Sequence, residues 1–271
     1  MSRPTTLGRL VPASLLALIA VLTLSGVGLK APVFAQQQPS VDQADKGTVV
    51  ASVSYRVVDR PAEAPASFAA PDGVDLRFLS YTAIDGVTDL AALAQPQGKA
   101  PRDTTLIVYV HGSGGNFYGP VAGNEVMPLA QKGYAGLTIS TRQHDRQINT
   151  DNFFDTRHDL AAATAIAKAL GYQRIVLQGH SLGTSQVLYY AATDWSPEIK
   201  GVILAAPFAD LPWKTQNVLV ANDPLFRQLY QEAMAAVAGG HPDDVLPTRM
   251  PYLEGQQSPV TARHFLTYRW V

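Results

Sequence analysis

The first strongly apolar stretch of the chain covers residues 10–29 and follows two arginines. It ends in small residues around Ala35, after which three glutamines begin a polar stretch. A basic start, an apolar middle and an A-x-A-like end are typical of a secretory signal peptide. We therefore expect residues 1–35 to be a signal peptide that is cleaved after Ala35, and residues 36–47 to form a disordered lead-in.

A retained membrane anchor is the alternative, because about 20 apolar residues could just span a bilayer. Ser14, Thr23 and Ser25 weaken that alternative, since they interrupt the apolar stretch. The signal-peptide interpretation predicts a secreted or periplasmic protein with no stable membrane insertion after the signal is removed. The absence of cysteine is compatible with such an oxidising compartment but does not establish it.

Alternating and β-branched segments predict a strand over residues 49–58 and another over 76–84, with a Pro- and Gly-containing loop at 59–73 and a turn-rich connector at 94–103. From residue 104 onward, strands and helices alternate. The predicted elements are strands over 104–110, 134–140, 175–178 and 202–206, and helices over 120–132, 155–170 and 182–192. This order predicts an α/β domain with a mostly parallel sheet and helices on both faces.

The pattern changes again beyond residue 206. Residues 207–257 contain six prolines and one helix-like stretch at 225–238, which is typical of a cap or lid. Residues 258–269 are predicted to form a helix with Pro259 at its first position.

Composition and charge exclude several classes of function. Charged residues make up 16% of the chain, below the roughly 25% of a typical soluble domain, so disordered tracts cannot dominate. The lack of cysteine excludes disulfides, a thiolate nucleophile and cysteine-based metal sites. A net charge of −1 gives no electrostatic reason to expect a nucleic-acid partner. The histidines are scattered and the carboxylates do not cluster at ligand spacing, so we expect no metal. No G-x-G-x-x-G fingerprint follows a strand with an acidic partner about 20 residues on, so we expect no cofactor.

One motif carries candidate chemistry. Gly179-His180-Ser181-Leu182-Gly183 fits G-x-S-x-G and lies between a predicted strand and a predicted helix, which is the setting of a nucleophile elbow. In such an elbow the serine occupies a strained, sharp turn that lifts its Oγ above the sheet. Side chains two residues away on either side would collide, so both positions are glycine. Ser181 is therefore the candidate nucleophile, and a tight turn that merely requires glycines is the alternative.

A second glycine-rich segment, His111 to Asn116, follows the predicted strand that ends at Val110. Acyl transfer needs hydrogen-bond donors for the oxyanion, usually two backbone N–H groups. We expect these to come from Leu182, directly after the nucleophile, and from Ser113 in this segment. A phosphate-binding loop is excluded, because no Lys-Ser/Thr follows the glycines. The two segments are expected to meet at the carboxyl ends of neighbouring strands.

On these motifs and their strand–helix order, the chain over residues 48–270 resembles the α/β hydrolases, and within them the esterase- and lipase-like serine hydrolases. The resemblance implies an α/β-hydrolase domain over residues 48–271, with a cap- or lid-like segment after the sixth strand. It also implies nucleophilic attack by Ser181 on the acyl carbon of a small-molecule substrate, without indicating which substrate.

The chain departs from the family pattern in its C-terminal part. The triad order of the fold is serine, acid, histidine, but no closing strands with the acid and the histidine are recognisable after residue 206, so we expect the fold to be C-terminally incomplete. Asp210 is a possible acid, because it lies just beyond a predicted strand end; a helix cap is the alternative. His241 and His264 are weak candidates for the base. His111 is expected to hydrogen-bond its own loop.

Two alternatives to a complete serine hydrolase stay open. One is a non-catalytic protein of the same fold that binds apolar ligands or partners and lacks the triad histidine and acid. The other is a fragment that cannot fold stably, because missing strands would expose a sheet edge.

Overall fold

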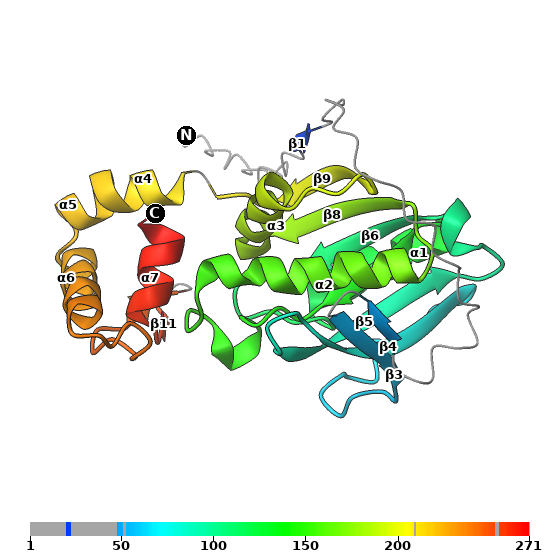
Figure 1. Cartoon of the computed structure of the whole chain (residues 1–271), viewed down its shortest axis with the longest axis horizontal. Helices are drawn as coiled ribbons and strands as arrows, with labels where there is room; N and C mark the ends of the chain where they lie inside the picture. The colour runs from blue at the N-terminus through cyan, green and yellow to red at the C-terminus, as the bar shows by residue number, and fades with distance from the viewer. Residues whose placement is uncertain (1–19, 23–47, 51–52, 209, 253–254, 271) are drawn as a thin grey trace, which may run out of the picture.

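The computed structural model describes residues 20–22, 48–50, 53–208, 210–252 and 255–270. Within them, nine strands form one mixed sheet in the order β1-β9-β8-β6-β7-β5-β4-β3-β2 (Figure 1). The strands are β1 (Ala20–Leu22), β2 (Thr48–Val50), β3 (Val53–Val58), β4 (Val74–Thr82), β5 (Thr88–Pro96), β6 (Thr105–Val110), β7 (Ala135–Ile139), β8 (Arg174–His180) and β9 (Ile199–Ala205). β7, β6, β8 and β9 run parallel, and the remaining pairings are antiparallel.

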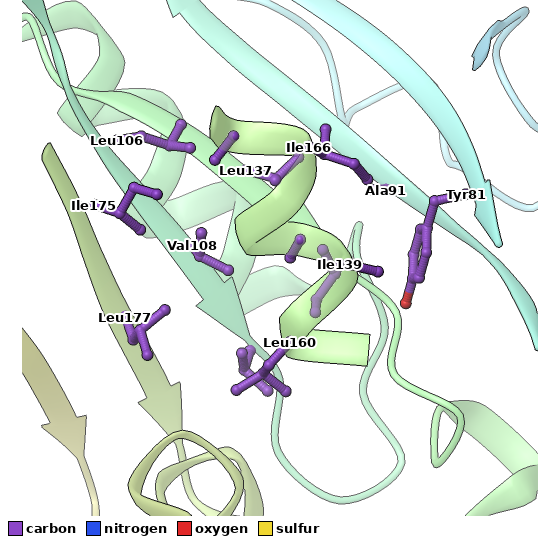
Figure 2. Close-up of a cluster of buried hydrophobic side chains, with 14 of the residues drawn as sticks. Tyr81, Ala91, Leu106, Val108, Leu137, Ile139, Leu160, Ile166, Ile175 and Leu177 are labelled. Carbon is purple, nitrogen blue, oxygen red and sulfur yellow. The ribbon is translucent and has the colours of Figure 1, made fainter. Parts of the chain in front are cut away.

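Three helices cover the two faces of this sheet, as the strand–helix order predicts. α2 (Thr156–Ala169) and α3 (Leu182–Thr193) pack on one face, and α1 (Pro120–Gln131) packs on the other. Leu160 and Ile166 of α2 are fully buried against β6, β7 and β8 (Figure 2). Full burial of such a side chain contributes about 1.5–3 kcal/mol. The predicted α/β class, with helices on both faces of the sheet, is confirmed.

The direction of the parallel strands determines at which edge of the sheet a site can form. β6 and β8 are direct neighbours, with Val110 opposite Gly179, so the loops that follow both strands leave the same edge of the sheet. In doubly wound folds this edge is where ligands bind. The predicted juxtaposition of the two glycine-rich segments is confirmed.

After β9 the chain builds a cap at this end of the sheet (Figure 1). It consists of α4 (Leu211–Lys214), the π-helical turn Thr215–Leu219, α5 (Val220–Asn222), α6 (Pro224–Ala238), β10 (Met250–Pro251), β11 (Gln257–Ser258) and α7 (Ala262–Arg269). Leu229 on α6 and Phe265 on α7 are fully buried in the core of the cap. Because α7 completes that core, the cap extends beyond the predicted boundary at residue 257.

The structure differs from the predicted strands in two places. The predicted strand over 49–58 is two strands, β2 and β3, which pair antiparallel with Val50 opposite Val53. The sequence pattern predicts no strand where β5 lies, and the predicted connector at 94–103 overlaps the last residues of β5. β5 is alanine-rich, and alanine has low intrinsic strand propensity. Burial between β4 and β7 makes it a strand nonetheless.

The last helix begins later than predicted. Ser258 lies in β11, opposite Met250, and its Oγ accepts a hydrogen bond from Asn149 Nδ2 (2.7 Å). Thr261 is therefore the N-cap of α7, and its Oγ1 accepts from the His264 N–H (3.2 Å).

Most of the predicted signal peptide and lead-in lies outside the described residues. β1 is the described part of it, and it pairs antiparallel with β9. Cleavage after Ala35 would remove β1 and leave β9 as a sheet edge. Within the described ranges, no helix has the length and apolarity that crossing a bilayer requires.

Candidate active site

The turn between β8 and α3 holds Ser181 in a conformation that is rare for a residue with a side chain. Its φ is 53° and its ψ is −117°, outside the regions that serine adopts without strain. A buried strand on one side and a packed helix on the other hold the backbone there. The strained turn that the G-x-S-x-G spacing predicts is present.

Close backbone contacts explain the two flanking glycines. A Cβ on Gly179 would overlap the Gly183 carbonyl and lie 2.6 Å from the Thr184 nitrogen. A Cβ on Gly183 would overlap the Val110 carbonyl and lie 2.7 Å from the His111 oxygen. Both gaps are too short for any carbon, so only glycine lets β6, β8 and α3 approach this closely.

The loop after β6 packs directly against the serine. A Cβ on Gly112 would lie 3.0 Å from the Ser181 Cβ. The Gly115 N–H donates to the Gly112 carbonyl (3.0 Å), which closes a tight turn around Ser113. The backbone of this loop therefore lies beside the Ser181 side chain, where N–H groups could reach a developing oxyanion.

Ser181 and this loop line a cavity of about 490 Å³ that the cap covers from the other side. The sheet side contributes Tyr109, residues 111–116, Asn149, His180, Ser181 and Phe208, and the cap side contributes Met250, Pro251, Tyr252, Tyr268 and Arg269. The Tyr252 hydroxyl donates to the Ser113 carbonyl (2.5 Å), so the cap is hydrogen-bonded to the loop. A cavity of this size suits a small-molecule ligand.

Comparison with known proteins agrees with this geometry. A family model described as the alpha/beta hydrolase fold matches residues 105–241, about half of the chain, from β6 to the end of α6. The chain belongs to the α/β-hydrolase fold family.

Individual relatives of this α/β hydrolase are distant. A non-heme chloroperoxidase from Burkholderia pyrrocinia is 29% identical over 123 residues, which are 43% of this chain and 42% of that protein. The chain thus spans less than half the length of this relative. A hypothetical protein from Pseudomonas aeruginosa superposes with a TM-score of 0.57 at 16% identity, covering 77% of this chain and 75% of that one, which shows the fold alone. An acetyl xylan esterase from Paenibacillus sp. R4 gives a TM-score of 0.45 at 19% identity, covering 67% and 65%.

Of the predicted site residues of this α/β hydrolase, Ser181 and Ser113 line the cavity, and Leu182 is buried beneath it as the first residue of α3. Asp210 is the N-cap of α4, where its Oδ1 accepts from the Trp213 N–H (2.8 Å), and it is not among the lining residues. The structure thus places Asp210 as the helix cap that was the alternative to its acid role.

His111 is held by its own loop, as expected. Its Nδ1 donates to the Gly112 carbonyl (2.7 Å), because a carbonyl can only accept, and its Nε2 accepts from the Thr141 N–H (3.0 Å). Burial lowers the pKa of His111 to about 4. With both nitrogens engaged, His111 orients the loop and is not free to take a proton from Ser181.

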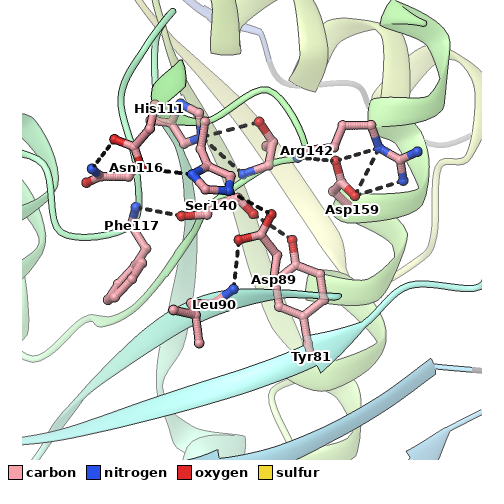
Figure 3. Close-up of polar contacts among 12 residues, drawn as sticks. Tyr81, Asp89, Leu90, His111, Asn116, Phe117, Ser140, Arg142 and Asp159 are labelled. Atoms are coloured by element: carbon pink, nitrogen blue, oxygen red, sulfur yellow. Dashed lines mark hydrogen bonds and ion pairs between the residues drawn. The ribbon is translucent and has the colours of Figure 1, made fainter. Parts of the chain in front are cut away.

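A buried ion-pair network supports the neighbouring strand ends (Figure 3). Arg142, which follows β7, binds both carboxylate oxygens of Asp159 on α2 (3.0 and 3.1 Å) and one oxygen of Asp85 (2.7 Å). Asp159 is fully buried, and it also accepts from the Arg142 backbone N–H (3.0 Å). The network joins α2 to the segment that holds Thr141, the hydrogen-bond partner of His111.

His241 and His264, the weak candidates for the base, do not line the cavity. His241 is exposed in the loop after α6. His264 is fully buried on α7, and its Nδ1 donates to the Asp151 carbonyl (2.9 Å). Its Nε2 has no hydrogen-bond partner among the residues that the structure describes. In the same residues, no group of three or more His, Cys, Asp or Glu side chains could hold a metal ion.

Sequence reasoning missed the cap residues of the site, namely Tyr252, Tyr268 and Arg269. Tyr268 and Arg269 fall in the predicted final helix, whose only assigned chemistry was His264. No local motif marks Tyr268 and Arg269, because they reach the cavity only through the packing of α7 against the sheet domain. Tyr268 stacks on Phe153 of the sheet domain, with ring centroids 4.9 Å apart, which brings the end of α7 to the cavity.

Acidification is expected to destabilise this α/β hydrolase through His264. Burial lowers its pKa to about 4, from an ordinary value near 6.5. Between these pH values the unfolded chain binds a proton that the folded protein does not, so the free energy of unfolding falls as the pH falls. For one such group, the slope of the free energy of unfolding against pH is at most about 1.4 kcal/mol per pH unit. His264→Gln should make the slope shallower by up to that amount in urea denaturation between pH 6.5 and 4.

The exposed His241 offers a matched control for that measurement. His241→Gln also removes a histidine, but from an exposed loop, so His264→Gln should change the slope more than His241→Gln does. An unchanged slope in His264→Gln would contradict the assignment of the effect to burial.

Proposed function

We propose that this α/β hydrolase is a serine hydrolase that cleaves carboxylic esters or related acyl bonds through an acyl-enzyme on Ser181. The observation that carries the proposal is the backbone of Ser181, strained at φ 53° in a turn that opens into a cavity. Strain of this kind persists only where the surrounding structure maintains it, and it clusters at functional sites. A turn that merely connected β8 to α3 would not need a serine at its most strained position.

In the proposed reaction, Ser181 Oγ bonds to the acyl carbon and the carbonyl oxygen becomes an oxyanion. The backbone N–H groups of Ser113 and Leu182 donate to this oxyanion. Because the folded backbone already holds these donors in place, they stabilise the negative charge without having to rearrange. Leu182 lies at the N-terminus of α3, where the helix dipole also favours negative charge. The intermediate then expels the alkoxide, which takes up the proton that Ser181 lost and leaves as the alcohol. Water hydrolyses the remaining acyl-enzyme to the acid and returns a proton to Ser181.

The reaction needs a base for the Ser181 proton. His111 cannot serve, because both of its nitrogens are engaged. An experiment on this proposal must therefore measure whether Ser181 reacts as an activated nucleophile, because correct folding alone does not establish that it does.

Reaction with a fluorophosphonate probe makes this distinction, because the probe bonds to activated serines. Intact-mass and peptide mass spectrometry should find one adduct, located on Ser181. Ser181→Ala should give none, and Ser67→Ala, which changes an exposed serine in a loop, should still be labelled at Ser181. A folded wild-type protein that carries no adduct on Ser181 would refute the proposal.

The engagement of His111 favours a second candidate, a non-catalytic protein that uses the same cavity for binding. This candidate predicts a folded, monodisperse protein that binds small ligands but forms no adduct and hydrolyses no model ester. The labelling experiment therefore separates the two.

A further inference from the structure

Arg269, the last residue of α7, brings to the cavity beside Ser181 a positive charge that has no ion-pair partner among the described residues. It lines the cavity, and its Nε is buried with no hydrogen-bond partner among the described residues. None of the ion pairs within the described ranges includes Arg269. In the described part of the cavity lining there is no Asp or Glu side chain.

Arg269 is half-buried, and the buried Arg142 shows what removing a guanidinium group from solvent normally requires. Arg142 is 6% exposed and is matched by two carboxylates, those of Asp159 and Asp85. A buried charge without a partner is strongly unfavourable, which is why buried guanidinium groups are usually paired. Two aromatic rings lie near the Arg269 guanidinium, whose Cζ is 5.7 Å from the Phe226 ring centroid and 5.9 Å from that of Tyr268.

Packing on both sides holds Arg269 in place. Tyr268 stacks on Phe153 of the sheet domain, and Trp270 stacks on Tyr230 of α6 with ring centroids 4.1 Å apart. Arg269 lies between these two anchored residues, so the backbone that carries its side chain is held at the cavity. The cation–π contacts of Arg269 offset only part of the free energy that the partial loss of hydration around the guanidinium costs.

We propose that Arg269 binds a carboxylate of the substrate, so that the compounds cleaved at Ser181 are esters that also carry a free carboxylate, such as monoesters of dicarboxylic acids. A guanidinium and a carboxylate form two parallel N–H···O bonds. Arg269 is the one Lys or Arg side chain in the described lining of the cavity, which matches a monoanion better than a dianionic phosphate. The proposal rests on the function proposed for Ser181, but the binding of the carboxylate can be measured separately.

The binding experiment uses the full chain with Ser181→Ala, so that no turnover interferes, and compares monomethyl glutarate with dimethyl glutarate by calorimetry. The monoanion should bind at least about tenfold more tightly than the neutral diester, because a charge-assisted hydrogen bond contributes about 1.5–3 kcal/mol. Adding Arg269→Gln should abolish this preference, and adding Arg269→Lys should leave part of it, since lysine keeps the charge without the planar fork.

Arg263→Gln is the matched control. Arg263 lies on the same helix but pairs with Asp243 at the surface, so its replacement should leave the preference intact. Equal binding of the two compounds to the parent, or an unchanged preference in Arg269→Gln, would overturn the proposal.

A partner within the chain is the competing explanation. Glu254 lies outside the described residues, two positions from the cavity residue Tyr252. If it pairs with Arg269, Arg269→Gln and Glu254→Gln should lower the Tm equally and non-additively, and the parent should not prefer the monoanion. That result would also overturn the proposal. We expect Glu254→Gln to leave the preference for the monoanion unchanged.

Turnover provides the second readout. With p-nitrophenyl hemiglutarate and p-nitrophenyl butyrate as substrates, the ratio of kcat/KM for the anionic ester over the neutral one should fall by at least about tenfold in Arg269→Gln, for the same reason. A preference in binding without an adduct on Ser181 would refute the catalytic proposal alone. An adduct without a preference would refute the role of Arg269 alone.

Discussion

Replacing Gly179 with alanine is expected to lower the free energy of unfolding by about 3 kcal/mol or more, or to prevent folding altogether. The added methyl carbon would overlap the Gly183 carbonyl and lie 2.6 Å from the Thr184 nitrogen. These atoms belong to the first turn of α3, whose backbone cannot yield without moving the helix. A shift of that size would also displace Ser181, so any folded Gly179→Ala protein should lose its reaction with the fluorophosphonate probe.

Gly201→Ala is the matched control for this substitution. Gly201 lies in β9, and a Cβ there would meet no heavy atom within 4 Å. Its replacement should change the stability by no more than about 1 kcal/mol, since a strand backbone accepts alanine. Chemical denaturation of the two variants measures the contrast. A Gly179→Ala protein as stable as the wild type would show that the turn is looser than the close contacts imply.

Replacing Asp159 with asparagine is expected to cost about 3 kcal/mol or more, because it removes the fully buried partner of Arg142 and leaves the buried guanidinium only partly compensated. Asp159 is fully buried and accepts from both the side chain and the backbone N–H of Arg142. Asp85 would remain as a partner, but it is more exposed, so solvent screens its interaction with the guanidinium. The measurement is the shift of the urea midpoint at neutral pH.

An exposed ion pair in the same protein serves as the comparison for Asp159. Asp243 binds Arg263 through two hydrogen bonds at the surface, where an ion pair contributes about 0–1 kcal/mol. Asp243→Asn should therefore have a small effect under the same conditions. Equal losses in the two variants would indicate that the Arg142 network is solvated and does not hold α2 in place.

The strand–turn–helix around Ser181 could be predicted because local sequence dictates it. Gly179 and Gly183 are required by close contacts with backbone atoms a few residues away or on the adjacent strand. The buried strand before them carries a continuous apolar run. The neighbouring position of the His111 loop also followed from the order of strands and helices. By contrast, β5 could not be predicted, because its alanines become a strand only through burial between β4 and β7.

The sequence by itself thus determined the fold family, the strained position of Ser181 and the loop that packs against it, since each depends on the spacing of a few neighbouring residues. Which residues line the cap side of the cavity was decided by the tertiary structure alone. Tyr252, Tyr268 and Arg269 reach Ser181's cavity through the packing of the cap, in particular the stacking of Tyr268 on Phe153. Such contacts join residues far apart in the chain, and no local pattern of apolar and polar positions encodes them.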